Sequence, residues 1–89
     1  MYTVYILYSQ TLHRYYVGYT NNLERRIAEH NRKKGKYTDR GIPWGLVYTE
    51  TFPDKLSAMN REKEIKKRKS RQYIESLVRS SVGRAFRFL

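Results

Sequence analysis

The chain has 89 residues, which is enough for one domain and too short for a second with its own core. Nineteen Lys and Arg against eight Asp and Glu give a formal charge of +11, which favours a polyanionic partner, with nucleic acid first. No apolar run approaches the ~20 residues that span a bilayer, and the absence of cysteine excludes disulfides, thiolate metal sites and a thiol nucleophile. We therefore expect a cytoplasmic protein with neither a signal peptide nor a membrane partner.

The first half of the chain predicts a β-hairpin followed by a helix. Residues 2–8 are rich in β-branched and aromatic types, and residues 15–19 form a second strand-like run after a short connection. Asn21 and Asn22 supply a helix N-cap, and apolar residues then recur at helical spacing to about Arg32. A basic loop with the sequence RKKGKYTDRGIPWG follows this helix.

The second half predicts a third strand and two more helices. Residues 46–52 alternate as a strand, residues 54–69 form a helix, and Ser70 begins the last one. The order β-β-α-β-α-α predicts an α+β domain over residues 1–79, with helices packed on a small sheet. Residues 80–89 have weak helical periodicity, and we expect a disordered tail or an extension outside the domain.

Two charged side chains of the first predicted helix can reach one point beside the core. At ~100° per residue, Leu23 and Ile27 centre the buried face of this helix. Arg26 and His30 lie at i and i+4 on one flank of that face. Arg25 faces the opposite side, where it meets solvent or phosphate. The spacing therefore places Arg26 and His30 together at the edge of the core.

Glu62 falls in the middle of the apolar arc of the second predicted helix. A carboxylate in that position is costly unless it is paired or binds a metal. The alternative is a surface ion pair with Lys66, worth a few tenths of a kcal/mol. Because acidic residues are few and scattered, a single divalent cation held by one carboxylate and waters fits better than a two-metal centre. The other members of the arc are Leu56, Ala58, Met59 and Ile65.

With this carboxylate used on metal, a general base must come from a tyrosine or a histidine. Tyr5 and Tyr16 fit, because a strongly positive site lowers the pKa of a phenol from its usual ~10. Strand alternation puts Tyr5 on the face opposite Val4. Tyr16 shares a face with Gly18, whose missing side chain leaves space for a substrate backbone. For either tyrosine, the alternative role is packing in the core or at its rim.

Three stretches of the chain resemble the GIY-YIG nuclease superfamily, in particular its small single-domain bacterial members: VYIL, YYVGYTNNLERRIAEHN and AMNREKEIKKRK. The most specific part is the pattern Tyr-Val-Gly-x-Thr-x-x-Leu-x-x-Arg-x-x-x-His from Tyr16 to His30, and the resemblance covers residues 2–70. TVY at residues 3–5 stands where GIY is expected, and YVG at residues 16–18 stands for YIG. The resemblance implies a three-stranded antiparallel sheet flanked by helices. It also implies hydrolysis of a DNA phosphodiester with one divalent ion, Mg²⁺ or Mn²⁺.

The resemblance implies catalytic roles for five residues. Tyr5 and Tyr16 match the two motif tyrosines that line the active site, one of which activates the attacking water. Arg26 matches the arginine that steadies the scissile phosphate, and Glu62 matches the single metal-binding glutamate. His30 matches a position where the family often has a polar residue that supports a tyrosine or the nucleophile.

We therefore expect a metal-dependent endonuclease that hydrolyses DNA phosphodiester bonds, with a role in DNA repair or recombination. One alternative is a non-catalytic nucleic-acid-binding module that keeps the fold, and another is an interaction surface for an acidic protein partner. A protein partner for targeting and the oligomeric state stay open. The expected nucleic-acid contacts, several of them in basic runs, are Gly18, Arg25, Lys33, Lys34, Lys36, Tyr37, Lys66 and Lys67.

Overall fold

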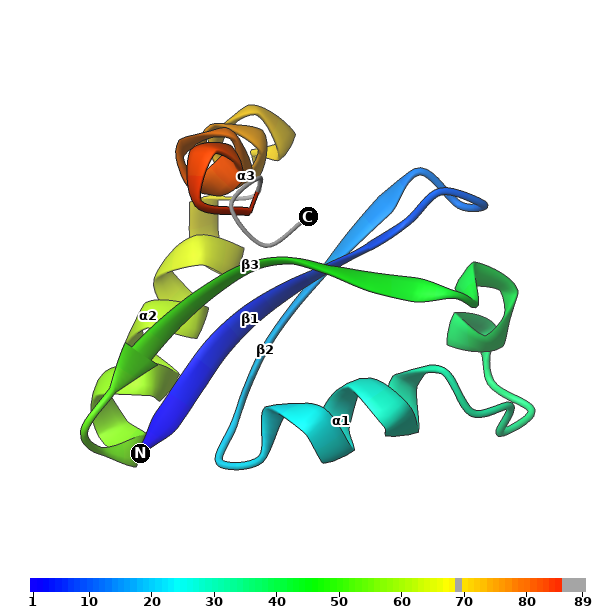
Figure 1. Cartoon of the computed structure of the whole chain (residues 1–89), viewed down its shortest axis with the longest axis horizontal. Helices are drawn as coiled ribbons and strands as arrows, with labels where there is room; N and C mark the ends of the chain where they lie inside the picture. Colours follow the sequence, from blue (N-terminus) through cyan, green and yellow to red (C-terminus); the bar gives the residue numbers. More distant parts are fainter. Residues whose placement is uncertain (69, 86–89) are drawn as a thin grey trace.

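The computed structural model describes residues 1–68 and 70–85. Strands β1 (Tyr2–Ser9) and β2 (Arg14–Thr20) form the predicted hairpin, and β3 (Trp44–Phe52) pairs with the other side of β1. The sheet is antiparallel with the order β2-β1-β3, so the first strand of the chain lies at its centre (Figure 1). The predicted order β-β-α-β-α-α is confirmed. The helices are α1 (Leu23–His30), a short 3₁₀ segment η1 (Tyr37–Gly41), α2 (Lys55–Arg68) and α3 (Arg71–Ala85).

The central strand β1 is buried on both faces, and each face has its own apolar core. Val4 and Ile6 pack with Ile65 of α2, and α3 closes the same core. Tyr5 and Leu7 point the other way and pack against α1. Figure 1 shows this division, with α1 on one side of the sheet and α2 and α3 on the other. The predicted alternation of β1 is therefore confirmed, and it directs Tyr5 toward α1.

Helix α1 begins where the sequence predicts and ends earlier. The side chain of Asn22 caps it by accepting a hydrogen bond at 3.1 Å from the backbone N–H of Arg25, the third residue of the helix. It ends at His30 rather than at Arg32, because Asn31 uses its side chain to bind β3. The Asn31 amide donates to the carbonyl of Trp44 at 3.0 Å and accepts from the N–H of Trp44 at 2.6 Å. This contact fixes the C-terminal end of α1 to the start of β3.

Helix α2 lies against the sheet through Ala58 and Ile65, both almost fully buried. Asp54 caps the helix and accepts a hydrogen bond from the backbone N–H of Ser57 at 2.7 Å. The prediction that Leu56 belongs to the buried arc is wrong, because its side chain is 65% exposed. Leu56 lies two residues before Ala58, about 200° around the helix, and so faces away from the sheet.

An ion-pair and hydrogen-bond network ties α2 to its neighbours. Arg61 donates to Glu50 of β3 at 3.0 Å and to the hydroxyl of Tyr73 of α3 at 3.0 Å, and it also pairs with Glu64. Tyr48 donates to the same Glu50 at 2.6 Å. These contacts fix the helix that carries Glu62 relative to the sheet.

Helix α3 begins after Ser70, whose hydroxyl accepts from the backbone N–H of Tyr73 at 3.1 Å. It continues to Ala85, beyond the predicted domain boundary at residue 79. The last four residues, 86–89, lie outside the described residues, so the tail remains a prediction there. Within the described part of the chain, no helix is both long and apolar enough to cross a membrane.

Candidate active site

A hollow of about 430 Å³ opens between α1, α2 and the ends of the first two strands. We call it the active-site hollow. Four of the five predicted catalytic residues line it: Tyr5, Tyr16, Arg26 and Glu62. They come from β1, β2, α1 and α2 respectively, so the fold brings together residues that lie far apart in the sequence.

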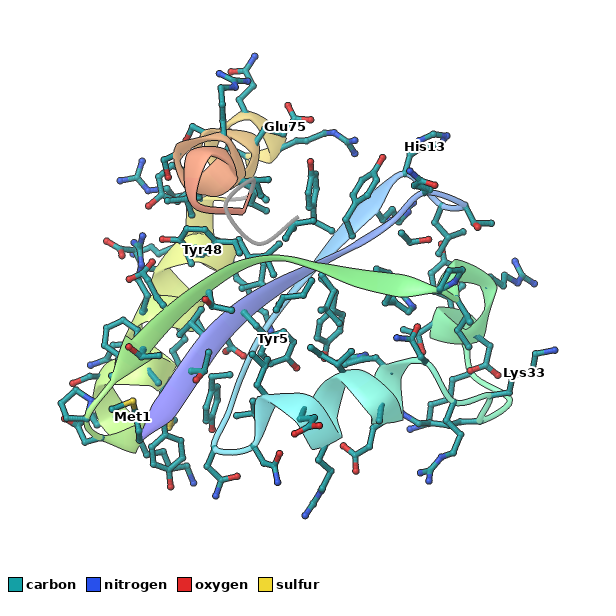
Figure 2. The ribbon with its side chains drawn as sticks, viewed as in Figure 1. Met1, Tyr5, His13, Lys33, Tyr48 and Glu75 are labelled. Atoms are coloured by element: carbon teal, nitrogen blue, oxygen red, sulfur yellow. The ribbon has the colours of Figure 1, made fainter. Side chains whose placement is uncertain are left out.

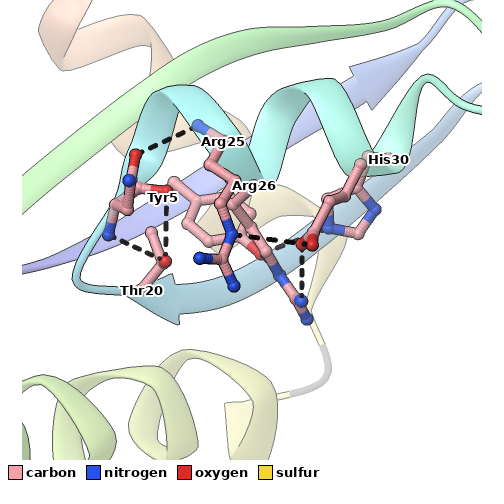
Figure 3. Close-up of polar contacts among 7 residues, drawn as sticks. Tyr5, Thr20, Arg25, Arg26 and His30 are labelled. Atoms are coloured by element: carbon pink, nitrogen blue, oxygen red, sulfur yellow. Dashed lines mark hydrogen bonds and ion pairs between the residues drawn. The ribbon is translucent and has the colours of Figure 1, made fainter.

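The fifth predicted residue, His30, does not line this hollow but contacts Tyr5 (Figure 3). The Tyr5 hydroxyl accepts a hydrogen bond from Nε of Arg26 at 3.3 Å and lies 3.2 Å from Nε2 of His30. Burial, together with the positive charges of Arg26 and Lys34, lowers the pKa of His30 below 6.5. A neutral His30 with its proton on Nδ1 can accept a hydrogen bond from the phenol O–H at Nε2. The phenol therefore has a donor on one side and an acceptor on the other.

Tyr5 does not have the lowered pKa that the sequence predicts. Burial raises its pKa above 10.0, although the hydrogen bond and the charge of Arg26 act in the opposite direction. The physical reason is that the side chain is fully buried, so that desolvation outweighs the positive neighbour. Tyr5 therefore keeps its proton and serves to hold Arg26 and His30 in place.

Gly18 makes room for Tyr5 rather than for substrate. The two residues are direct partners across β1 and β2. A Cβ atom built at Gly18 would lie 2.5 Å from the hydroxyl oxygen of Tyr5 and 2.7 Å from its Cζ. The expectation that this space admits a substrate backbone is therefore wrong. The glycine is required because the Tyr5 ring lies across the neighbouring strand.

Tyr16 is the more accessible of the two motif tyrosines. Its ring packs edge-on against His30, with the ring centres 4.4 Å apart, and stacks near Tyr5 at 6.4 Å. Tyr5 is fully buried, whereas Tyr16 is only partly buried at the edge of the hollow. A water molecule or a phosphate in the hollow can thus meet the Tyr16 phenol directly.

Glu29 is a site residue that the sequence reasoning missed. One oxygen accepts a hydrogen bond from Nη1 of Arg26 at 3.3 Å, and the other lies 3.8 Å from Nε of Arg25. The prediction that Arg25 faces away from the site is wrong, because its long side chain reaches the wall of the same hollow. The spacing of Glu29 from the two arginines, i+3 and i+4, is the signal that could have identified it.

Glu62 forms the wall of the hollow opposite Arg26. The ion pair with Lys66, which the sequence left open as an alternative to metal binding, is present, since Lys66 lies 3.5 Å from the Glu62 carboxylate. The carboxylate nevertheless also lines the hollow, and its side chain is 16% exposed. Among residues 1–68 and 70–85 there is no group of three or more His, Cys, Asp and Glu side chains that could enclose a metal ion. One carboxylate beside an open hollow suits Mg²⁺, which keeps most of its waters.

A second hollow of about 220 Å³ lies between α1 and the basic loop that follows it. We call it the lysine hollow. Lys34 and Lys36, both predicted contacts, lie on its loop side, while Tyr16 and Arg26 form the wall that it shares with the active-site hollow.

The remaining predicted contacts lie elsewhere. Figure 2 shows Lys33 at the outer end of the loop, and Tyr37 is 55% exposed beside the guanidinium of Arg40. Lys55, which the sequence reasoning missed, lines the active-site hollow from the start of α2. The predicted contacts that line neither hollow are Lys33, Tyr37, Lys66 and Lys67.

The sequence matches the family model described as the GIY-YIG catalytic domain over residues 1–74. A UPF0213 protein of Natronomonas pharaonis is 51% identical over 69 residues, which cover 76% of this chain and 80% of that protein. A UPF0213 protein of Staphylococcus haemolyticus is 58% identical over 52 residues, covering 57% of this chain and 63% of that protein. The solution NMR structure of a UPF0213 protein from Bacillus halodurans aligns with a TM-score of 0.54 and 36% identity, over 88% of this chain and 83% of that one. The family match includes every residue of both hollows.

Proposed function

The chain belongs to the GIY-YIG family, which is a family of nucleases, and from this premise we propose that it is a metal-dependent endonuclease that hydrolyses DNA phosphodiester bonds. One observation carries the proposal. Tyr16, Arg26 and Glu62, from three different elements, line a single hollow in a chain with a formal charge of +11. This set offers a phenol, a fixed cation and a carboxylate around one point, as hydrolysis of a phosphate diester requires.

Arg26 is positioned to neutralise charge on the scissile phosphate. Its Nε donates to Tyr5 and its Nη1 donates to Glu29, so the orientation of the guanidinium is fixed from two sides. The side chain is still 44% exposed, and its remaining N–H groups are free to face the hollow. A guanidinium held in advance stabilises the growing negative charge on a phosphate without further reorganisation.

Tyr16 is the better candidate for the base that takes a proton from the attacking water. Both tyrosines line the hollow, but Tyr16 is partly exposed there, whereas Tyr5 is fully buried and has a raised pKa. In this proposal Tyr16, acting as a phenolate, takes a proton from the water, whose oxygen forms a bond to phosphorus. The bond from phosphorus to the leaving ester oxygen breaks, and that oxygen takes up a proton from solvent. Tyr5 and His30 act as positioning residues, because they touch Arg26 and Tyr16 rather than the substrate.

Glu62 is the residue that would hold a divalent cation. Its carboxylate faces a hollow wide enough for a hydrated ion, and a single lysine at 3.5 Å leaves the carboxylate oxygens accessible. When bound, such an ion would polarise the phosphate and stabilise the leaving oxygen.

A cleavage assay on duplex, nicked, branched and single-stranded DNA, with Mg²⁺, with Mn²⁺ or with chelator, tests the proposal. We expect cleavage that needs metal and falls by about 100-fold or more in Glu62→Gln and Arg26→Ala. Glu24→Gln and Arg32→Ala remove the same charges from exposed positions outside the hollow and should cleave like wild type. Cleavage in the presence of chelator, or undiminished cleavage by Glu62→Gln, would contradict the proposal.

The second candidate is a nucleic-acid-binding module without catalysis, and the +11 charge with its two cation-lined hollows supports it. The same assay separates the two functions. Salt-sensitive binding of DNA by the wild-type protein, with no cleavage of any substrate in either metal, would favour the module.

A further inference from the structure

The lysine hollow and the active-site hollow are neighbours that share one wall. Tyr16, Arg26 and Glu29 line both of them. The lysine hollow extends from Arg26 toward Lys34 and Lys36, and the active-site hollow extends the other way toward Glu62. A nucleic-acid strand whose phosphate sits on Arg26 therefore has a second cationic site on one side.

The protein neutralises only part of the positive charge of the lysine hollow, where Asp39 lies close to Lys34. Its one carboxylate, Glu29, is already paired with Arg26. None of the ion pairs between residues of the described ranges, 1–68 and 70–85, involves Lys34 or Lys36. The positive charge of Lys34 also acts on the interior, because it helps to lower the pKa of His30. Clustered cations that line a concave site attract an anion.

Asp39 fixes the backbone from which the two lysines extend. Its two carboxylate oxygens accept the backbone N–H of Lys34 at 3.0 and 2.9 Å. One of these oxygens also accepts the N–H groups of Gly35 at 2.6 Å and of Lys36 at 3.3 Å. Gly35 has a φ of +73°, a conformation that turns consecutive N–H groups toward one point. The loop therefore has a defined shape, which a run of lysines alone would not give it.

The far end of the loop is fixed as well. The indole N–H of Trp44 donates to the carbonyl of Thr38 at 2.9 Å, and Trp44 itself is only 5% exposed. Asn31, at the end of α1, binds both backbone groups of Trp44. The lysine hollow is thus held between two anchored segments of the chain.

We propose that the lysine hollow binds a phosphate of the nucleic-acid strand, the one next to the phosphate that Arg26 and Glu62 address. Lys34 and Lys36 supply the charge, and Asp39 is a positioning residue for both. The inference deepens the proposed nuclease function and rests on it. If the lysine hollow binds this phosphate, the strand runs from the lysine hollow over Arg26 into the active-site hollow, and the scissile phosphate lies on the Glu62 side.

Binding of labelled oligonucleotides in the absence of divalent metal, at about 50 to 200 mM salt, tests the role of the lysines. For the double variant Lys34→Gln/Lys36→Gln we expect roughly tenfold weaker binding. The slope of log K against log salt should fall by about 0.7 on single strands or 0.9 on duplex, as for the loss of one phosphate contact. Lys63→Gln/Arg79→Gln removes two charges from exposed positions outside both hollows and should lose less. Equal losses in the two double variants would overturn the inference.

Asp39→Asn tests the positioning role, because charge and geometry predict opposite results. The variant becomes more positive by one charge, so electrostatic attraction alone predicts tighter binding. The amide keeps one acceptor oxygen but places its NH2 group against the backbone N–H of Lys34, where Oδ1 accepts at 3.0 Å. Its neutral oxygen also binds the N–H groups of the loop more weakly than the carboxylate does, so the proposal predicts weaker binding, as in the lysine variants. Glu75→Gln removes the same charge on α3, away from the loop (Figure 2), and should not weaken binding. Tighter binding by Asp39→Asn would refute the positioning role.

Two comparisons separate this inference from the alternatives. Oligonucleotides with and without a 5′-phosphate should show the same loss in the lysine variants, and a loss confined to the phosphorylated ones would overturn the assignment to an internal phosphate. If the wild-type protein neither binds nor cleaves nucleic acid, the proposed function itself fails. If the wild-type protein cleaves while the lysine variants bind like their control, this inference alone fails.

Discussion

Gly18→Ala should disable the site by displacing Tyr5 without removing any functional group. The new Cβ would lie 2.5 Å from the Tyr5 hydroxyl oxygen and 2.7 Å from Cζ, whereas non-bonded atoms are comfortable at about 3.5–4.0 Å. The phenol must therefore withdraw by roughly 1 Å. Its contacts to Arg26 and His30, at 3.3 and 3.2 Å, are already near the limit of a hydrogen bond, and a shift of this size breaks both.

The expected cost is about 100-fold in cleavage rate, which is typical of a 1 Å misplacement in a catalytic constellation. Overpacking of a filled core should also destabilise the protein by about 1–3 kcal/mol. For a domain of this size, each kcal/mol corresponds to roughly 4–8 °C in Tm. The assays are single-turnover cleavage of DNA and thermal unfolding followed by circular dichroism.

Two controls make the result interpretable. Gly45→Ala places its Cβ 4.0 Å from the nearest atom, an ordinary contact, and should leave both the rate and Tm near wild type. Tyr5→Phe removes the same hydrogen bonds without the clash, so it should match Gly18→Ala in rate and exceed it in stability. A folded Gly18→Ala protein with wild-type cleavage would refute the claim that Tyr5 holds the site together.

The remaining predictions concern stability. Ile65→Ala, at a position that is 1% exposed, should lower the free energy of unfolding in urea by about 2–5 kcal/mol. Leu56→Ala, on the exposed side of the same helix, should lower it by no more than about 0.5 kcal/mol. Similar losses in the two variants would contradict the assigned faces of α2. Because the native state holds the pKa of His30 below 6.5, the unfolded state takes up a proton more readily as the pH falls through that value. The free energy of unfolding should therefore fall as the pH drops below about 6.5 and level off below the native pKa of His30. His30→Gln should flatten this pH dependence. An unchanged profile in the variant would show that other groups cause the pH dependence.

Periodicity was sufficient to predict the order of the elements and the residues that converge. Alternation along β1 separated Tyr5 from Val4, and helical spacing placed Arg26 and His30 on one flank, as the structure has them. Glu62 could be identified because a carboxylate in an apolar arc is costly unless it is paired or binds a metal. These predictions depend on the direction of the Cβ atom, which the local backbone determines.

The errors arose where the answer depends on a partner far along the chain. The role of Gly18 depends on strand register, which pairs it with Tyr5 and which no local pattern reveals. Arg25 leaves its helix on the far flank, but its long stem bends back to Glu29 and the hollow. The raised pKa of Tyr5 likewise depends on the burial that α1 imposes, which outweighs the positive neighbour.

The position of Tyr5 in the central strand has a consequence for how the site can move. Its neighbours in the strand, Val4 and Ile6, belong to the core on the α2 side of the sheet, so one short segment supports both Tyr5 and the packing of α2. This segment pairs with a strand on each side and belongs to the part of the fold that opens only with global unfolding. Adaptation to a substrate therefore falls to the exposed long side chains, Arg25 in the active-site hollow and Lys34 and Lys36 in the lysine hollow, while the central strand beneath them stays rigid.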